Sequence, residues 1–402
     1  GSCLPGVDLA EPWSKNDGQA RVYEIKEGVY MRKTGSYQKL GNLEFFIPDP
    51  LPPIPALVWD EELSCIYGEA LFALGKLNEM GQKLPNIERF IRAYVIKEAL
   101  LSSAIEGIHT TLVDVFTSPL DDIKLNKDTQ LVLNYTQAAM AALELMQQAG
   151  LPVINRVLLR AHEILMGNGV GDQAAPGNFR KQSVRVGPLV PPPATAIGEL
   201  MGQLEQYINV AGDLPPLIKA GLAHVQFETI HPFLDGNGRI GRLLIILMFV
   251  QDGLLTLPIL YPSYYFKKHH TTYYYLLDRV RTHGDWESWI KFYLSVIKDS
   301  AQDAYQRARS IEALENQIKQ VLATDPDFKR VQASADLVLK VLFSSPVSTI
   351  TYISIQINKS YNTVHHILKL FQKQGWVTSV VRQARNKLYH FTPYLELLER
   401  VF

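Results

Sequence analysis

The chain has little cysteine and no long apolar run. Its 402 residues include two cysteines, Cys3 and Cys65, so neither a disulfide framework nor a cysteine-based zinc site is available. The longest purely apolar run, Leu243 to Val250, is far too short to span a bilayer. No charged-then-apolar leader opens the sequence. These absences predict a protein of the cytoplasm, a reducing compartment, with no membrane association.

The chain also lacks an excess of charge of either sign, although its charges are unevenly distributed. Forty Lys and Arg residues balance forty Asp and Glu residues. From Lys329 to the end, ten basic residues face three acidic ones, a net of +7, which leaves 30 against 37, a net of −7, for the rest. This asymmetry predicts a separate basic module at the C-terminus, in a chain long enough for two or three domains.

Local patterns divide the chain into an arm, a helical body and a C-terminal module. Residues 1–58 mix turn formers with aromatics and end in a stiff proline-rich segment, which predicts an N-terminal arm. Residues 59–328 are dominated by the helical period. One stretch, residues 177–193, interrupts the helices: its SVRV core alternates and is bounded by Gly and Pro, which predicts a short β-hairpin.

The C-terminal module, residues 329–402, has the pattern of a winged helix. One helix is followed by two helices joined at a short turn, and then by two alternating segments around the basic turn RQARN. If the module binds DNA, the expected phosphate contacts are Arg382, Arg385 and Lys387 on the wing. Its second helix has no obvious set of base-reading side chains, so DNA binding and protein docking both remain open.

The most informative stretch is HPFLDGNGRIGR, residues 231–242. Asp-Gly and Asn-Gly are turn dipeptides, so the glycines alone could mark a tight link between two helices. Such a link does not explain Arg239 and Arg242, which share one face at the start of an apolar helix. Two cations at the positive end of a helix dipole are unfavourable unless an anion lies among them. We therefore predict a polyphosphate site that also uses the loop amides of Gly236 to Gly238.

Two further side chains of this stretch suit chemistry on a phosphate. Asp235 supplies a hard oxygen ligand for Mg²⁺, an ion that bridges phosphates through few protein ligands. His231 ends the preceding helix beside the loop, where a neutral imidazole could take a proton from a hydroxyl group.

The same stretch resembles the signature of the Fic family (filamentation induced by cAMP), HPFx[D/E]GNGRxxR, with every specified position filled. The resemblance covers about residues 46–294. It implies a mainly α Fic-fold domain with a β-hairpin flap, here followed by a small winged-helix domain. Fic proteins are mostly protein adenylyltransferases, which move AMP from ATP to a Tyr, Thr or Ser hydroxyl. The implied ligands are ATP and Mg²⁺, and the implied partner is a protein target, with self-modification and a homodimer as open alternatives.

The resemblance assigns a role to each signature residue. His231 would be the general base, Asp235 would hold Mg²⁺ on the α- and β-phosphates, and Phe233 would anchor the loop in the core. An anion hole would form from Gly236, Asn237 and Gly238, with the Asn237 side chain also directed at phosphate. Both arginines, Arg239 and Arg242, would bind the outer phosphates.

Two more regions acquire a role through the resemblance. Tyr273 and Tyr274 match a tyrosine pair near the adenine, although ordinary packing in an aromatic-rich helix explains them almost as well. The hairpin occupies the place of the family's flap, on which a target segment could add as a strand. Its charged residues Arg180, Lys181 and Arg185 could instead keep the edge soluble. The expected docking residues of the flap are Arg180, Ser183, Val184, Arg185 and Val186.

The hexapeptide SSAIEG, residues 102–107, matches the inhibitory-helix motif [S/T]xxxE[G/N] of the family. Glu106 lies at the negative end of its helix, with Gly107 in the C-cap place, so its carboxylate needs a cationic partner. The resemblance implies that Glu106, with Ser102 in the same motif, binds Arg242 and blocks the productive pose of ATP. Because the motif precedes the signature, the chain is similar to the class inhibited from its N-terminal side.

Two alternatives to AMP transfer remain at this stage. The same site could run in reverse with water and remove AMP from modified proteins, with Glu106 orienting the water. The chain could also act mainly as a DNA-binding regulator whose Fic body senses a nucleotide. The basic C-terminal module favours the second alternative, and the intact His231 argues against it.

Overall fold

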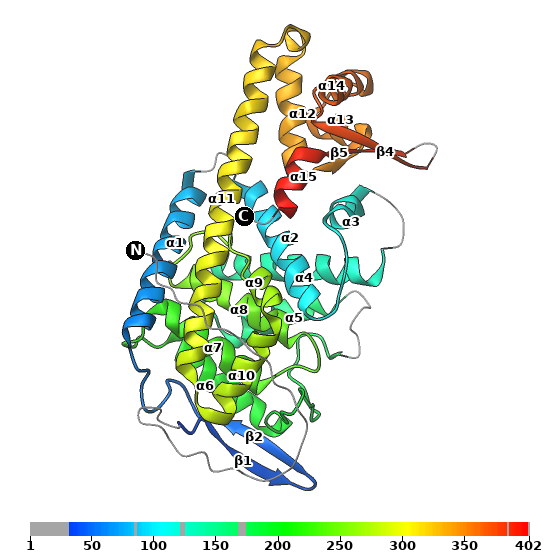
Figure 1. The fold of residues 1–402 in the computed structure, drawn as a ribbon. Coiled ribbons are helices and arrows are strands. Elements are labelled where there is room, and N and C mark those ends of the chain that lie inside the picture. Colours follow the sequence, from blue (N-terminus) through cyan, green and yellow to red (C-terminus); the bar gives the residue numbers. More distant parts are fainter. Residues whose placement is uncertain (1–31, 84–86, 121–124, 168–173, 384–385, 401–402) are drawn as a thin grey trace. The chain divides into compact units, whose positions relative to one another are not determined.

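Helices dominate the part of the chain that the computed structural model describes, residues 32–402 except 84–86, 121–124, 168–173, 384–385 and 401–402 (Figure 1). Most of the predicted N-terminal arm, residues 1–31, lies outside the described residues. Residues 32–402 form one compact unit, and the boundaries expected at residues 58 and 328 stay predictions. No helix among the described residues is both long enough and apolar enough to cross a membrane.

The elements follow one another in this order. The helices are α1 (Glu61–Lys83), α2 (Ile87–Ile105), α3 (Leu112–Thr117), α4 (Lys127–Gln148), α5 (Asn155–Leu165), α6 (Ile197–Asn209), α7 (Pro216–Ile230), α8 (Asn237–Gln251), α9 (Ser263–Lys268), α10 (His270–His283), α11 (Trp286–Thr324), α12 (Gln332–Ser344), α13 (Ile350–Ile357), α14 (Tyr361–Lys373) and α15 (Thr392–Glu399). The strands are β1 (Gly35–Leu40), β2 (Leu43–Pro48), β3 (Val347–Ser348), β4 (Val377–Gln383) and β5 (Asn386–Phe391). Short 3-10 turns cover Ser118–Leu120, Ala194–Ala196 and Pro326–Phe328.

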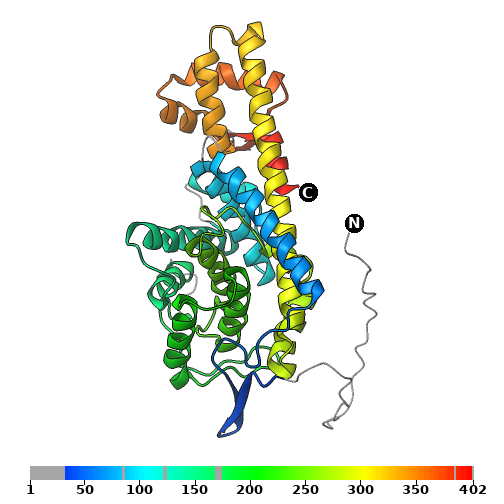
Figure 2. The same cartoon turned by 90° about the vertical axis from the view of Figure 1, so that its left-hand side faces the viewer.

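The core of the helical body is built around α7 and α8. Both helices are apolar on nearly every face, and almost all their residues are buried, as expected for helices enclosed by others. They pack against each other, with α2, α4 and α5 against α8 and with α6, α10 and α11 against α7. On the outside, α1 runs along the long α11 (Figures 1 and 2). The loop from α7 to α8 therefore starts and ends on rigid, buried elements.

A β-hairpin that the sequence analysis missed precedes α1. Its strands β1 and β2 are antiparallel, with Gly35 opposite Pro48 and Leu40 opposite Leu43. The two-residue turn Gly41-Asn42 is a typical hairpin signal, which the surrounding turn formers obscured. Phe45 and Phe46 of β2 are buried.

The hairpin predicted within residues 177–193 is much shorter than expected. Its described pairing is one antiparallel bridge between Val186 and Leu189, on either side of a Gly-Pro turn. The SVRV segment itself is not a strand. The second limb joins the N-terminal hairpin instead, because the Phe46 N–H donates to the Val190 carbonyl at 2.9 Å.

The C-terminal module shows the predicted order of one helix, a helix–turn–helix and two strands. α13 and α14 meet at Asn358, which has a left-handed backbone conformation with φ 51°. β3 and α15 were not predicted; β3 joins the module's antiparallel sheet in the order β3-β5-β4. The assignment of this module to the winged-helix class stays a prediction.

The last helix of the module, α15, packs against the helical body. Lys97 of α2 donates to the Leu398 carbonyl at 2.5 Å. Arg307 of α11 donates to the carbonyls of Leu397 and Arg400. Basic side chains thus bind the carbonyl end of α15, where cations are favoured.

Candidate functional site

The signature loop is a sharp turn between two buried helices. His231, directly after α7, has a left-handed conformation with φ 50°, and its N–H still donates to the Phe227 carbonyl at 2.9 Å. Gly236, directly before α8, is also left-handed, with φ 82°. A left-handed backbone is unfavourable for a residue with a Cβ, so the backbone at His231 must be held in place by its neighbours.

Asn237 closes this loop from the inside. Its Oδ1 accepts from the Phe233 N–H and its Nδ2 donates to the Phe233 carbonyl, both at 2.8 Å. The expectation that this side chain points at phosphate is therefore wrong in this structure, because the buried amide is occupied by the loop backbone. The expected anchor is confirmed: Phe233 is fully buried.

His162 of α5, which the sequence analysis did not single out, also holds the loop. Its Nδ1 accepts from the Gly177 N–H at 3.0 Å, so Nε2 carries the proton and donates to the Asp235 carbonyl at 3.0 Å. The imidazole stacks on Phe233, with 3.8 Å between ring centroids. Burial lowers the pKa of His162 to about 4, which keeps this tautomer neutral. No sequence motif marks this residue.

Two buried arginines lie at the start of α8. The Nε and Nη1 atoms of Arg239 are buried and have no hydrogen-bond partner among the described residues, while its Nη2 lies 3.4 Å from Oδ1 of Asp235. Burial lowers the pKa of Arg239. A buried guanidinium with unpaired N–H groups is costly unless an anion binds there. These unpaired N–H groups are therefore the feature of this helix end that an anion would satisfy.

Arg242, one turn further along α8, is paired as predicted. Its Nη2 lies 2.7 Å from Oε1 of Glu106 and 3.0 Å from the Ser102 carbonyl, and its Nε donates to Ser102 Oγ at 2.8 Å. Burial acts to lower the pKa of Arg242, but Glu106, Tyr273, Glu228 and Tyr274 together raise it above its usual value. The residues of the proposed inhibitory motif and the second signature arginine therefore meet in the fold.

The Glu106 carboxylate also lies against the first turn of α8. A Cβ added at Gly238 would overlap Oε1 of Glu106, so the carboxylate could not keep this position beside a larger residue. The N–H groups of a first helical turn have no partner within the helix and attract anions. Gly107 has φ 76° and ends the segment as predicted. Glu106 therefore lies where the sequence predicts an anionic ligand.

A second carboxyl group, on Glu228 of α7, was not predicted. The residue is half-buried, its Oε1 atom is buried without a hydrogen-bond partner among the described residues, and a Cβ at Gly241 would overlap that atom. Burial raises the pKa of Glu228 to about 7, although the charge of Arg242 opposes the shift. Two glycines one turn apart on α8 thus admit two carboxyl groups near Arg242.

His231 is held in a neutral form suited to a base. Burial lowers its pKa to about 4, the carbonyl of Glu228 opposes that shift, and the charge of Arg180 adds to it. The Nδ1 atom lies 3.3 Å from the Glu228 carbonyl. Because a carbonyl only accepts, Nδ1 carries the proton, which leaves the lone pair of Nε2 for a hydroxyl proton.

The two tyrosines expected near adenine have different environments in the structure. Tyr273 is buried, and its hydroxyl donates to Nε2 of His224 on α7, whose Nδ1 in turn donates to the Gly241 carbonyl; both contacts are 2.8 Å. Packing therefore explains Tyr273. Tyr274 is 45% exposed, and burial raises its pKa to about 12, with a further rise from the nearby Glu106 charge. Tyr274 remains the candidate for contact with a base.

The flap residues have different environments. Arg180 is buried, so the expectation that it contacts a target or keeps an edge soluble is wrong; its guanidinium bonds backbone carbonyls instead. Ser183 and Arg185 are exposed and Val184 is partly exposed. The N–H and carbonyl of Val186 are used by Leu189.

Asp235 fits a Mg²⁺ ligand of the kind expected beside phosphates. Its side chain is 66% exposed, and its Oδ1 accepts from the Gly236 N–H at 2.5 Å. The described residues contain no group of three or more His, Cys, Asp or Glu side chains that could hold a metal. A single exposed carboxylate suits Mg²⁺, which completes its shell with phosphate oxygens and water.

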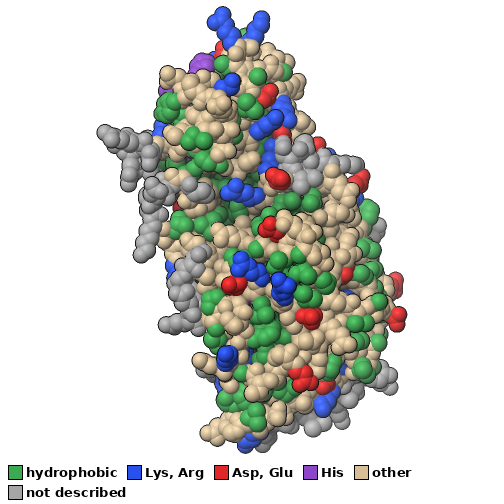
Figure 3. Space-filling view, turned by 180° about the vertical axis from the view of Figure 1, so that it is seen from behind, with side chains coloured by type: hydrophobic (Ala, Val, Ile, Leu, Met, Phe, Trp, Pro, Cys, Tyr) green, Lys and Arg blue, Asp and Glu red, His purple; other side chains and the backbone are tan. Residues whose placement is uncertain are grey.

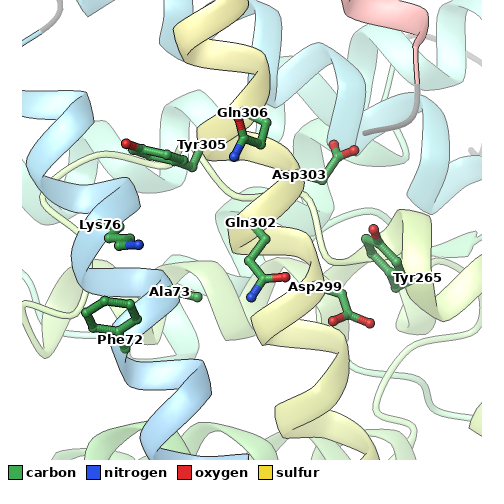
Figure 4. Close-up of a pocket in the computed structure, with 9 residues that line it drawn as sticks. All are labelled: Phe72, Ala73, Lys76, Tyr265, Asp299, Gln302, Asp303, Tyr305 and Gln306. Carbon is green, nitrogen blue, oxygen red and sulfur yellow. The ribbon is translucent and has the colours of Figure 1, made fainter. Parts of the chain in front are cut away.

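A hollow elsewhere on the molecule is not part of this site. It has a volume of about 350 Å³ and is lined by residues of α1, α9 and α11, among them Lys76, Tyr265 and Gln302 (Figure 4). None of its lining residues belongs to the signature or the inhibitory motif.

The comparisons with known proteins identify the family. Residues 66–144 match the model described as the Fic/DOC family N-terminal region, and residues 153–249 match the model described as the Fic/DOC family. The chain contains a Fic domain. The signature and the inhibitory motif lie inside the two matched segments.

Named relatives and a solved structure agree with this assignment. Proteins named Protein adenylyltransferase Fic from Drosophila willistoni and Drosophila mojavensis are each 30% identical over 172 residues, 42% of this chain and 32% of the relative. The chain thus spans about a third of the length of these relatives. A Fic family protein from Desulfovibrio desulfuricans has the same fold, with TM-score 0.51 at 22% identity over 84% of this chain and 97% of that chain.

Proposed function

We propose that the chain is a protein AMP-transferase, which moves AMP from ATP to a hydroxyl side chain of a target protein and is held inactive by Glu106. The buried, partly unpaired guanidinium of Arg239 is the observation that carries the proposal, because it lies at a helix N-terminus beside Arg242. The names of the Drosophila relatives support the AMP-transferase activity.

The proposed reaction begins when the outer phosphates of ATP displace the Glu106 carboxylate. Arg239 and Arg242 then bind these phosphates, and the N–H groups of the first turn of α8 bind the remaining phosphate of ATP. Asp235 would hold Mg²⁺, which when bound offsets phosphate charge. Phosphoryl-type transfer needs mainly alignment and fixed positive charge from the protein, and these residues supply both.

His231 acts on the acceptor in this proposal. Its Nε2 takes the proton of the target hydroxyl while the hydroxyl oxygen bonds to the α-phosphorus. The bond from that phosphorus to the oxygen bridging the α- and β-phosphates breaks, and pyrophosphate leaves. The low pKa of His231 keeps Nε2 free to accept a proton at neutral pH, and the arrival of phosphate charge would raise its basicity.

The flap is the proposed docking edge for the target. Among the described residues, the backbone of residues 183–185 makes no hydrogen bond to another part of the backbone, and two of these three residues are exposed. Such an edge can receive an extended target segment by main-chain bonding, which would present its hydroxyl to His231.

Transfer of labelled AMP tests the proposal. Purified protein should incorporate label from ATP labelled on its α-phosphate, into itself or into lysate proteins, and His231→Ala should abolish incorporation. Release of AMP from previously labelled proteins, without incorporation, would support the reverse reaction instead.

A second function, DNA binding by the C-terminal module, is favoured by its charge and its helix–turn–helix. Lys329 and Arg330 are exposed between α11 and α12. Figure 3 shows Lys and Arg side chains at the top of the view, the end of the molecule where α11 and α12 meet. Of the wing residues, Lys387 is exposed, Arg385 lies outside the described residues, and the side chain of Arg382 is likewise not described.

Salt dependence distinguishes DNA binding from protein docking. The full chain should shift a duplex at low salt, and the affinity should fall steeply as salt rises because bound phosphates release counterions. Replacing Lys387 with methionine should reduce the salt slope by about one. No shift of any duplex at low salt would favour protein docking.

A further inference from the structure

Arg180 carries a buried positive charge that no described acidic side chain pairs. Its side chain is fully covered, with 2% of the residue exposed. Nε donates to the His231 carbonyl at 2.7 Å, Nη1 to the Gln182 carbonyl at 2.9 Å, and Nη2 to the Pro192 carbonyl at 2.6 Å. A buried charge that bonds backbone carbonyls is expensive to keep, and plain packing would be served better by an apolar side chain.

The three acceptors belong to three different segments. Gln182 lies on the first limb of the flap, Pro192 on the second limb, and His231 at the start of the signature loop. A single guanidinium thus joins both limbs of the flap to the residue proposed as the base.

Arg180 also bonds the backbone carbonyls on either side of His231. Its Nη2 lies 3.4 Å from the Ile230 carbonyl, and its own N–H donates to the Pro232 carbonyl at 2.8 Å. The carbonyls of Ile230, His231 and Pro232 are therefore all bonded by one residue. They lie at the negative end of the α7 dipole, where a cation is favoured. These bonds stabilise the left-handed conformation that directs the His231 imidazole.

The charge of Arg180 acts on the imidazole together with other groups. The groups that face His231 are Glu106 after α2, Arg281 of α10 and the carbonyl of Glu228 on α7. Burial is the largest cause of the lowered pKa of His231, and the positive charges of Arg180 and Arg281 add to it.

We propose that Arg180 is a positioning residue of AMP transfer, which fixes the direction of His231 and couples it to the flap that receives the target. This inference rests on the proposed function of His231. It replaces the expectation that Arg180 contacts the target or keeps the flap soluble.

Two substitutions separate the charge of Arg180 from its geometry. Arg180→Lys keeps the charge, but an ammonium cannot span three separated carbonyls in the planar arrangement of a guanidinium. Arg180→Met removes the charge at similar length. Lys181→Met serves as the control, because Lys181 is an exposed cation next in sequence.

Titration of His231 by NMR of labelled histidine provides a readout that needs no activity. The wild-type midpoint should lie near 4, and Arg180→Lys and Lys181→Met should leave it low. Arg180→Met should raise it by about one unit, since a nearby like charge is removed. A folded Arg180→Met protein with an unchanged midpoint would overturn the electrostatic part of the inference.

Kinetics test the geometric part. Both Arg180 variants should lower kcat for AMP transfer by about 10²-fold through misplacement of the base, while the KM for ATP stays close to the wild-type value. A normal kcat in Arg180→Lys would overturn the positioning role. If wild type and Glu106→Gly transfer no AMP at all, the proposed function fails, and the titration still decides the effect of Arg180 on His231.

Discussion

Replacing Glu106 with glycine should raise AMP transfer by one to two orders of magnitude. The carboxylate pairs with the buried Arg242 at 2.7 Å but is itself 33% exposed. The strength of this ion pair should thus lie between that of exposed pairs, about 0.2–1 kcal/mol, and that of buried pairs, about 3–5 kcal/mol. A value of about 1–3 kcal/mol corresponds to a factor of about 5–150, which ATP must overcome to seat its outer phosphates.

The fold should tolerate this substitution. Glu106 lies just beyond the last residue of α2, so an added glycine there does not interrupt a helix. Glu144→Gly on the exposed side of α4 is the matched control, because it also removes a carboxylate and adds a glycine. Arg242→Ala should not reproduce the gain, since it removes the partner of the phosphate together with that of the inhibitor.

The assay is incorporation of label from ATP carrying it on the α-phosphate, measured on the protein itself and on lysate proteins. Initial rates should rise in Glu106→Gly and stay unchanged in Glu144→Gly. Equal or lower incorporation in Glu106→Gly would refute the inhibitory role, and Glu106 would then be a catalytic or a structural residue.

Three further predictions concern the loop and its supports. His231→Ala should lower AMP transfer by about 10²–10⁴-fold while calorimetric ATP binding stays near the wild-type value, and undiminished transfer would exclude His231 as the base. Arg239→Met should weaken ATP binding in the Glu106→Gly background yet not lower the melting temperature, because it removes unpaired buried N–H groups; unchanged affinity would contradict the anion site. The pKa of His162 is about 4 in the folded protein, against an ordinary value of 6.5. As the pH falls from 6.5 toward 4, the unfolded chain therefore binds a proton at this residue that the folded protein does not bind. The stability advantage of wild type over His162→Gln, measured with denaturant, should therefore shrink by about 3 kcal/mol across that window, and a constant difference would contradict the assignment.

The parts of the site that the sequence predicts share a local cause. The signature arginines lie one turn apart on a helix, and Glu106 lies at a helix end that disfavours a carboxylate. Spacing places the two arginines on one helix face, and helix electrostatics predict a cationic partner for Glu106. That this partner is Arg242 was implied by the resemblance to the Fic family. The long buried helices around the loop follow from periodicity in the same way.

The parts that escaped prediction depend on contacts between distant segments. His162 bonds Gly177 and the Asp235 carbonyl, and Arg180 bonds carbonyls on three segments. Nothing in the local sequence distinguishes a surface arginine from one that folding buries among carbonyls. Glu228 was missed for the same reason, because its Oε1 atom is buried in the space left by Gly241 on another helix.

The orientation of Asn237 illustrates a different limit. An asparagine in a glycine-rich loop can direct its amide at a ligand or at its own backbone, and both choices fit the same sequence. The four-residue spacing to Phe233 allows two hydrogen bonds within the loop, which stabilise the turn before any ligand arrives.

The mass of the intact protein after incubation with ATP and Mg²⁺ tests the central claim most directly. Glu106→Gly should gain the mass of one or more AMP groups, and fragmentation should place each group on a hydroxyl side chain. The combined Glu106→Gly, His231→Ala protein, which should still bind ATP, should gain none, because release of the inhibitor cannot replace the base. An AMP adduct of equal yield in the combined variant, or none in Glu106→Gly despite bound ATP, would contradict AMP transfer by His231 under the control of Glu106.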